Sequence, residues 1–381
     1  MHSGNGKKWV RTVSAFVAFA VVCLGVFSVI IRLAPVLSTG NGAFSLFAAG
    51  FLFPDGRALA EGEGDDVSSL SPSASSDPSS GAESSQGETS APSSQPDDVS
   101  SNTPTVGPAV SEIEPDPNRR SFPVVESQFG ASGIQYNNFY VKNTNRNHPI
   151  NIAEELSRRP DINIKKDGSP QVLIVHTHTC ESYMDADLGY YYEDYYPRTD
   201  DPNHNVTRVG AAIAEKLEAA GIGVIHDTTI HDTTYSGSYD RSIATIEKHL
   251  KESPSIQVVL DIHRDALEGS NNSKIKPTFV ANGKKAAQIM IISGCEDDDS
   301  FSFPDWEYNL RFALRLQQSA ENLYPGMTRP LYFSHTRYNM HLTRGSLLIE
   351  VGTDANTLDE AVYSGSLLGD VLIDVLNGLT V

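Results

Sequence analysis

Residues 121–381 predict an α/β fold, with an open, mostly parallel, twisted sheet flanked by helices. The prediction rests on two observations. Short runs of aliphatic residues alternate along this segment with longer stretches of helical periodicity, which is the order that βαβ units produce. The short runs are also apolar at nearly every position, as expected for strands that are buried on both faces. A segment of this length can bury one substantial core.

Six of the short runs are the expected strands, and four longer stretches are the expected helices. The strands cover residues 172–176, 223–226, 257–262, 288–293, 330–334 and 347–351. The helices cover residues 206–220, 242–252, 306–324 and 358–376. Gly221 follows the first helix and is expected to end it, because glycine readily takes the left-handed conformation that terminates helices.

The N-terminal region predicts a membrane anchor. Residues 12–31 carry no charged side chain, and a helix of about 20 residues crosses the hydrocarbon core of a bilayer. We therefore expect a cytoplasmic basic tail over residues 1–11 and one transmembrane helix over residues 12–34. The basic residues just before the run leave the N-terminus in the cytoplasm by the positive-inside rule, with the rest of the chain outside. A cleaved signal peptide is the alternative, although its apolar region usually spans only about 7–15 residues.

Two further segments separate this anchor from the α/β domain. Residues 35–60 are apolar enough to lie against the membrane, and we assign them no role. Residues 61–120 predict a disordered linker, because a segment rich in Ser, Pro, Gly, Asp and Glu buries too little apolar surface to fold. Twelve acidic side chains between positions 61 and 118 account for most of the formal net charge of -19, so the charge says little about a ligand. Elsewhere Lys and Arg are scattered among acidic residues, and no nucleic-acid partner is expected.

Three of the expected strands end in side chains that can bind a metal or move a proton. In open α/β sheets, binding sites form beyond the carboxyl ends of the strands, so these side chains are expected to converge in one crevice. The residues at the three strand ends are His176, His178 and Glu181, then Asp261, His263, Arg264 and Asp265, and finally Glu350.

The types and spacing of these residues predict a catalytic zinc site. Such a site takes about three protein ligands from His and acidic residues and leaves one position for water. His178 and Glu181 have the H-x-x-E spacing that lets both side chains reach one ion from a turn, and His263 on a neighbouring strand is the third ligand. Bound zinc lowers the pKa of water to about 7. Glu350 is the expected general base, which then protonates the leaving amine.

Several of these residues have a second interpretation. His176 competes with His178 for the metal, because their i, i+2 spacing puts both on one face if the strand continues, so that one binds the ion and the other orients it. Arg264 is counted with Glu350 as a catalytic residue, and Arg264 and Asp265 either position the substrate or hold the histidines. Glu350 paired with Arg264 would instead be a structural ion pair.

Beyond these residues, the chain resembles the stage II sporulation protein P family of endospore-forming Gram-positive bacteria. The resemblance covers the chain from about residue 134 to the C-terminus and is carried by segments that include VLIVHTHTCESY, VVLDIHRDA, YPGMTRPL and LLIEVGTDANTLDEA. It implies the fold of zinc N-acetylmuramoyl-L-alanine amidases, with Zn2+ held by His178, Glu181 and His263 and a catalytic carboxylate at Glu350. It does not decide between His176 and His178.

The resemblance also implies a function and partners. Members of the family cleave the amide between N-acetylmuramic acid and L-alanine in peptidoglycan, with an endopeptidase activity on peptide crosslinks, and they thin the septal wall while the forespore is engulfed. The implied setting is a single-pass protein of the mother-cell membrane whose catalytic domain lies outside the cytoplasm. The implied partners are peptidoglycan and the stage II sporulation proteins D and M.

Two other functions are consistent with the same residues. A zinc carboxypeptidase or endopeptidase that acts only on stem peptides would use an H-x-x-E pair, a distant His and a late Glu equally well. A non-catalytic wall-binding scaffold is the third hypothesis, although a scaffold would not need ligand-type side chains at three strand ends.

Overall fold

The computed structural model describes residues 114–298 and 300–381. The predicted basic tail, membrane anchor and juxtamembrane segment lie outside these residues, as does the predicted linker except for its last few positions. Among the described residues, no helix is both long enough and apolar enough to cross a membrane.

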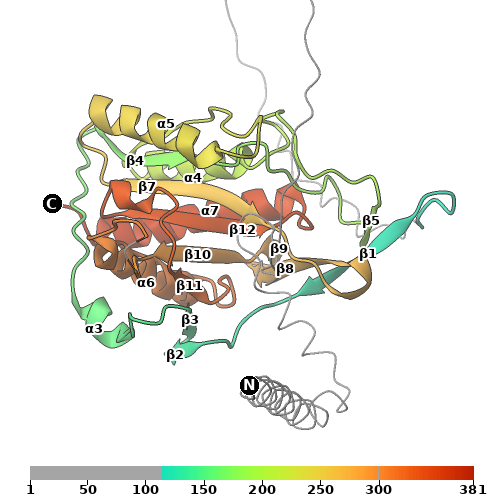
Figure 1. Ribbon diagram of the computed structural model, residues 1–381, viewed down its shortest axis with the longest axis horizontal. Helices are drawn as coiled ribbons and strands as arrows, with labels where there is room; N and C mark the ends of the chain where they lie inside the picture. The colour runs from blue at the N-terminus through green and yellow to red at the C-terminus, as the bar shows by residue number, and fades with distance from the viewer. Residues whose placement is uncertain (1–113, 299) are drawn as a thin grey trace, which may run out of the picture.

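An eight-stranded sheet forms the centre of the described domain (Figure 1). All neighbouring strands in it are parallel except the pairs β2–β3 and β10–β12. Strands β12, β7, β4 and β6 therefore point the same way, and this part of the sheet has the predicted open, parallel architecture. In spatial order the strands are β2 (Ile134–Tyr136), β3 (Phe139–Asn143), β11 (Leu331–Ser334), β10 (Ile289–Gly294), β12 (Ser346–Thr353), β7 (Val258–Asp265), β4 (Pro170–Val175) and β6 (Gly223–His226).

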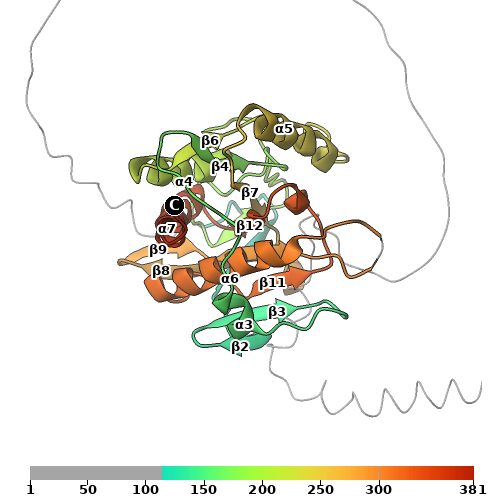
Figure 2. The same cartoon turned by 90° about the vertical axis from the view of Figure 1, so that its left-hand side faces the viewer.

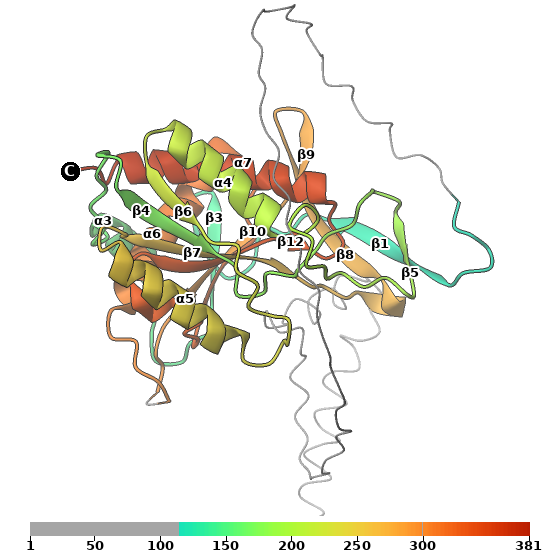
Figure 3. The same ribbon diagram turned by 90° about the horizontal axis from the view of Figure 1, so that it is seen from above.

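Helices cover both faces of this sheet. One face carries α5 (Ser238–Glu252), whereas α4 (Thr207–Ala219) and α7 (Leu358–Asn377) pack against each other on the opposite face (Figures 2 and 3). Helix α6 (Trp306–Leu323) shares the core of α4 and α7. The short elements are α3 (Ile152–Ser157), which packs against α6, and the 3-10 turns η1 (Ser270–Asn272) and η2 (Met340–Leu342).

Alternation along the strands decides which layer each side chain faces. On β4, Val172 and Ile174 belong to the large core beneath α4, α6 and α7. Leu173 and Val175 point the other way and pack with Ile246 of α5. Polar residues that take the place of apolar ones on this second face therefore lie on the α5 side of the sheet.

Every predicted strand and helix is present, with small displacements at the ends. The largest is in α5, which begins at Ser238 rather than at residue 242. Gly221 follows the C-cap of α4 with a φ of 77°, so it takes the left-handed conformation expected of the residue that ends this helix.

A second sheet corrects the prediction of a single one. Its strands, in spatial order, are β5 (Tyr190–Tyr192), β1 (Ser121–Ser127), β8 (Lys274–Ala281) and β9 (Lys284–Ala287). The sheet adjoins the carboxyl ends of β7 and β12 (Figure 1), where the Thr353 hydroxyl donates to the backbone carbonyl of Ile275 at 2.8 Å. Strand β8 lacks the apolar signature of the predicted strands because it carries lysines, yet its Lys276 is buried among carboxylates.

Candidate metal centre

Strand β7 carries a polar stripe on the α5 side of the sheet. Leu260 and Ile262 face the large core, whereas Asp261, His263 and Asp265 occupy the alternate positions and are all buried. Burying three ionisable side chains in a row is costly unless partners or a ligand compensate them. The stripe therefore marks a place where partners or a ligand must compensate these groups.

Glu350 joins this stripe from the neighbouring strand. It lies opposite His263 in the parallel register of β12 and β7, so both side chains point to the same face. The register shifts directly after Glu350, where Gly352 has a φ of 68°. A Cβ atom at Gly352 would lie 2.7 Å from Oδ1 of Asn356, so this bend requires glycine. The bend ends the regular pairing just past the two side chains.

The third contribution comes from the turn that follows β4. The backbone N–H of Glu181 donates to the carbonyl of His178 at 3.0 Å, which closes a turn and brings the H-x-x-E pair together. Oε2 of Glu181 lies 3.6 Å from Nδ1 of His263 and accepts the backbone N–H of Arg264 at 3.1 Å. The predicted ligands His178, Glu181 and His263 therefore meet in one place.

Aromatic side chains hold the two predicted ligand histidines. The rings of His178 and His263 are nearly perpendicular, with centroids 5.3 Å apart. Tyr235 stacks on His178 at 4.6 Å, and Tyr239 of α5 meets the edge of the same ring at 5.6 Å. Asp232 lies 4.0 Å from Nδ1 of His178.

Several buried polar atoms of the site have no hydrogen-bond partner among the described residues. Both ring nitrogens of His178 and both carboxylate oxygens of Glu350 are buried without such a partner within residues 114–298 and 300–381, and the ring nitrogens of His263 make only ion-pair contacts, to Asp261 and Glu181. Buried polar atoms are almost always paired, and an unpaired one costs about 1–3 kcal/mol. Such atoms on imidazole and carboxylate groups fit a divalent cation such as zinc, which those groups ligate.

The candidate donor atoms are not at coordination spacing in the described residues. No group of three or more His, Cys, Asp or Glu side chains within residues 114–298 and 300–381 meets the geometric requirements for a metal site. The fit to a metal rests on the chemistry of the donors and on their unpaired atoms.

His176 differs from His178 in its partners. Nδ1 of His176 lies 2.9 Å from the carbonyl of Ile262, and its Nε2 lies 2.9 Å from Nε2 of His226. Burial, together with the neighbouring His226, lowers the pKa of His176 to about 3. Both of its ring nitrogens are thus engaged within the protein, and of the two histidines only His178 has both nitrogens unpaired.

Arg264 and Asp265 are buried beside the site but have other partners. The Arg264 guanidinium donates to the backbone carbonyls of Ser182 at 3.0 Å and Pro197 at 2.8 Å, so it holds the loop that follows Glu181. Asp265 forms an ion pair of 2.7 Å with Arg329. Within the described part of the chain, neither side chain forms a hydrogen bond or an ion pair with the histidines.

The two carboxyl groups of the site have opposite acidities. Burial raises the pKa of the Glu350 carboxyl well above its ordinary range, and the nearby Asp265 carboxylate raises it further. Burial also acts to raise the pKa of Glu181, but His263 and Arg264 lower it to about 2. Glu350 is therefore suited to hold and release a proton, whereas Glu181 stays ionised.

Some residues of the site were not assigned a role from the sequence. Asp261, Asp232 and Tyr239 surround the two histidines but were given no function. Asp261 carried a usable signal, because it shares the strand face of His263 two residues away. Asp232 lies in a loop and Tyr239 in α5, each more than 50 residues along the chain from His178. Only the fold brings them to the site, so no spacing rule indicates them.

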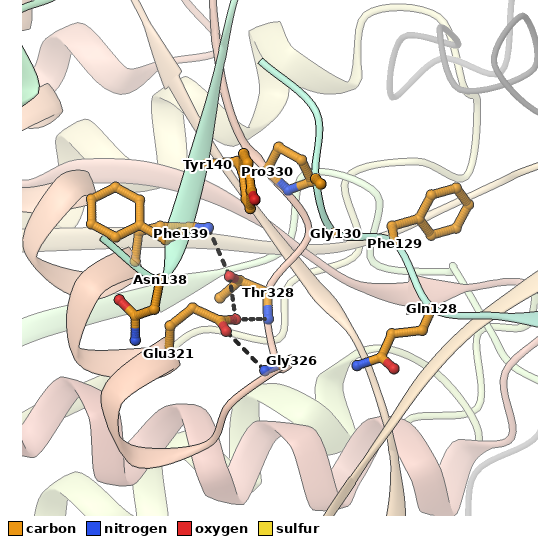
Figure 4. Close-up of a pocket in the computed structure, with 12 residues that line it drawn as sticks. Gln128, Phe129, Gly130, Asn138, Phe139, Tyr140, Glu321, Gly326, Thr328 and Pro330 are labelled. Atoms are coloured by element: carbon orange, nitrogen blue, oxygen red, sulfur yellow. Dashed lines mark hydrogen bonds between the residues drawn. The ribbon is translucent and has the colours of Figure 1, made fainter. Parts of the chain in front are cut away.

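A separate hollow of about 350 Å3 lies at the end of α6 (Figure 4). The Glu321 carboxylate beside it accepts the backbone N–H groups of Gly326 at 2.8 Å and Thr328 at 2.7 Å. No residue of the candidate metal centre lines this hollow.

Fold and site together define an α/β protein with a candidate His/Glu metal centre at the carboxyl edge of a mixed sheet. The model of the family "Stage II sporulation protein P (SpoIIP)" matches residues 66–373. The chain therefore belongs to the stage II sporulation protein P family, as its motifs predicted.

One relative also matches the chain, at low sequence identity. Stage II sporulation protein P of Bacillus subtilis (strain 168) is 28% identical over 245 residues, which cover 59% of this chain and 58% of the relative. The match thus spans less than two thirds of that relative's length.

Similar solved structures include the CwlD amidase from Clostridioides difficile in complex with the GerS lipoprotein, with 13% identity, a TM-score of 0.36, and coverage of 55% of this chain and 98% of that chain. N-acetylmuramoyl-L-alanine amidase AmiC2 of Nostoc punctiforme has 11% identity, a TM-score of 0.32, and coverage of 56% of this chain and 99% of that chain. TM-scores this low place no residue of the site.

Proposed function

We propose that this chain is a zinc-dependent peptidoglycan hydrolase that cleaves the amide between N-acetylmuramic acid and L-alanine. One observation carries the proposal. His178, His263 and Glu350 come from three neighbouring strands or strand ends, and the buried ring nitrogens of His178 and carboxylate oxygens of Glu350 have no hydrogen-bond partner among the described residues. A structural cluster would pair these atoms, whereas a site that binds an ion and a substrate leaves them available.

His178, Glu181 and His263 would hold the ion. Bound zinc supplies a more acidic water and polarises the amide carbonyl. The backbone N–H of Arg264 orients the Glu181 carboxylate, and the Arg264 side chain fixes the loop behind it. Arg264 is in this account a positioning residue.

Glu350 is the proton carrier in the proposed reaction. It faces the same side of the sheet as His263 and has no competing hydrogen bond. A carboxyl group whose pKa is raised by burial can take a proton near neutral pH and return it to a leaving amine. Glutamate at this position therefore fits amide hydrolysis, in which the amine leaves poorly unless it is protonated.

Membership of the family supports a role in peptidoglycan degradation during sporulation. We propose that the protein degrades septal peptidoglycan during engulfment in sporulation, with an additional endopeptidase activity on crosslinked stem peptides. An N-terminal helix would anchor it in the mother-cell membrane with the described domain outside the cytoplasm. The stage II sporulation proteins D and M are its proposed partners.

The test is the identity of the products. Full-length protein loaded with zinc is incubated with purified peptidoglycan, and the soluble products are analysed by mass spectrometry. The proposal expects intact stem peptides with a free L-alanine amino group. Shortened stem peptides alone would favour the carboxypeptidase or endopeptidase alternative.

A matched variant separates catalysis from wall binding. Glu350→Gln preserves the size of the side chain but cannot carry the proton, so it is expected to bind peptidoglycan and release no peptide. Release at the normal rate by Glu350→Gln would contradict the proposed role. Binding to the wall without release by the unchanged, zinc-loaded protein would favour the scaffold alternative.

A further inference from the structure

Asp261 holds one edge of the His263 ring. It lies two residues before His263 on the same face of β7 and is buried. Its Oδ1 is 2.8 Å from Nε2 of His263, an ion-pair contact whose direction is not aligned for a hydrogen bond. The opposite edge of the ring, at Nδ1, faces Glu181 at 3.6 Å. The imidazole therefore lies between two carboxylates.

Thr177 fixes the Asp261 carboxylate from the neighbouring strand end. The backbone N–H of Thr177 donates to Oδ1 of Asp261 at 2.8 Å, and its hydroxyl donates to Oδ2 at 2.6 Å. Both oxygens of Asp261 thus have a donor, whereas neither oxygen of Glu350 has one among residues 114–298 and 300–381. This difference separates a group that holds another side chain from a group that is available to a ligand.

The polar chain continues into α5 and a turn beyond it. The Thr177 hydroxyl lies 2.7 Å from the Ser242 hydroxyl. Nδ2 of Asn339 donates to the same Ser242 hydroxyl at 3.0 Å and to the backbone carbonyl of Tyr239 at 3.2 Å. A buried path of polar contacts therefore connects His263 with Asn339.

Asn339 belongs to a strained turn that borders the candidate metal centre. Tyr338 has a φ of 38° and Asn339 a φ of 60°, both in the left-handed region that is unfavourable for a tyrosine. The Tyr338 ring packs on Tyr239 at 5.3 Å, and Tyr239 in turn stacks on His263 at 6.5 Å. Such a conformation persists only when its surroundings hold it, and the contacts of Asn339 provide that support.

We infer that Asp261 is a positioning residue of the metal centre. It turns His263 so that Nδ1 faces Glu181, and through Thr177 and Ser242 it ties this orientation to the turn at Asn339. The inference rests on the proposed function, because it takes His263 to be a metal ligand. Carboxylates that orient a ligand histidine typically change metal affinity about 10–100-fold.

The test is the zinc affinity of full-length variants, measured by competition with a chromophoric chelator. Asp261→Ala removes the carboxylate and is expected to weaken zinc binding about 10–100-fold. Asp261→Asn keeps an oxygen toward Thr177 and the imidazole and is expected to recover part of this loss. Ser242→Ala interrupts the chain further out, so its expected loss is smaller. Asp240→Ala removes an exposed carboxylate of the same helix and serves as the control.

Cobalt(II) in place of zinc gives a readout that a loss of stability alone would not change. The visible absorption of bound cobalt depends on ligand geometry, so Asp261→Ala is expected to shift the bands and Asp240→Ala to leave them unchanged. Equal affinity and equal spectra in these two variants would overturn the inference. If Asp261→Ala does not fold, Asp261→Asn decides: a measurable loss of affinity supports the inference, and no loss overturns it. Failure of the unchanged protein to bind either metal would overturn the proposed zinc function itself, so the two failures are distinguishable.

Discussion

Two polar clusters of this protein, one around the buried Lys276 and one around His178 and Glu350, differ in whether their atoms are paired. In the first cluster, Lys276 of β8 is surrounded by Asp187 at 2.7 Å, Glu360 at 3.1 Å and Glu126 at 3.7 Å. In the second, the candidate metal centre, the ring nitrogens of His178 and the carboxylate oxygens of Glu350 have no hydrogen-bond partner among the described residues. The charges of the first cluster compensate one another, whereas these polar atoms of the second cluster have no such partner in the part of the chain that the structure describes.

The paired cluster has a structural task. Glu360 also accepts the backbone N–H of Thr357 at 3.1 Å, which caps the N-terminus of α7. Asp187 lies in the loop that follows Glu181, so Lys276 connects that loop, the second sheet and α7. Buried ionic groups alone therefore do not indicate a site, but buried groups whose partners are missing do.

Replacing one carboxylate in each cluster tests whether the two clusters differ in function. Glu350→Gln is expected to lower the rate of wall hydrolysis about 10²–10⁴-fold, the usual contribution of a general acid–base group. Its unfolding free energy is expected to change by less than about 1 kcal/mol, because no hydrogen bond is lost. Peptide release and chemical denaturation measure the two effects.

Glu360→Gln is the matched variant and has the opposite expectation. It weakens the contacts to Lys276 and the α7 cap, so the unfolding free energy should fall by roughly 1–3 kcal/mol. Its rate of hydrolysis per folded molecule is expected to be unchanged. A stable but inactive Glu360→Gln protein would show that pairing does not distinguish the two clusters.

The next effect concerns the lysine itself. Lys276→Met leaves Asp187 and Glu360 buried or half-buried without their cation, and breaking such a buried pair costs about 3–5 kcal/mol. Denaturant titration of the full-length protein measures this loss. Zinc affinity should stay the same within error, since Lys276 contacts none of the proposed ligands. A large drop in zinc affinity at full folding would link the two clusters.

Removing the metal tests whether the candidate metal centre binds an ion. A ligand present at about 100 times its Kd stabilises the folded state by about 2.7 kcal/mol, so chelation should lower the melting temperature of the zinc-loaded protein. His178→Ala removes one proposed ligand and should make the melting temperature insensitive to the chelator. An equal chelator response in both proteins would place the zinc elsewhere.

The smallest expected effect is a pH dependence of the paired cluster. Burial acts to raise the pKa of Asp187, but Lys276 and Lys285 lower it below the ordinary value of 3.8. A lowered carboxyl pKa contributes stability above the ordinary pKa, and that stability is lost as the pH falls through the folded-state pKa. Stability of the unchanged protein should thus decline more steeply below about pH 4 than that of Lys276→Met. Parallel acid titrations would contradict this.

Much of the site could be predicted because its residues follow apolar strands. The strands that carry His263 and Glu350 are apolar runs that end in polar side chains, and strand ends converge in a parallel sheet. The H-x-x-E pair follows a third such run. These local signals are sufficient to predict six strands of the eight-stranded sheet, its four long helices and the proximity of His178, Glu181, His263 and Glu350, whereas the edge strands β2 and β3 were not predicted.

The rest depends on contacts that sequence spacing does not reveal. The choice between His176 and His178 rests on His226, a partner fifty positions along the chain from His176. Strand β8 was not predicted because its lysines break the apolar pattern of a buried strand. The carboxylates that allow Lys276 to be buried come from distant segments of the chain. Arg264 was grouped with Glu350 by position, yet its side chain holds loop carbonyls.

The most direct test of the metal centre is anomalous X-ray diffraction at the zinc absorption edge from crystals of the zinc-loaded protein. A zinc ion held as proposed should give one strong peak within roughly 2.0–2.2 Å of a nitrogen of His178, a nitrogen of His263 and an oxygen of Glu181, with Glu350 beside it. A peak at the His176–His226 pair, or full zinc occupancy at any other place, would contradict this arrangement.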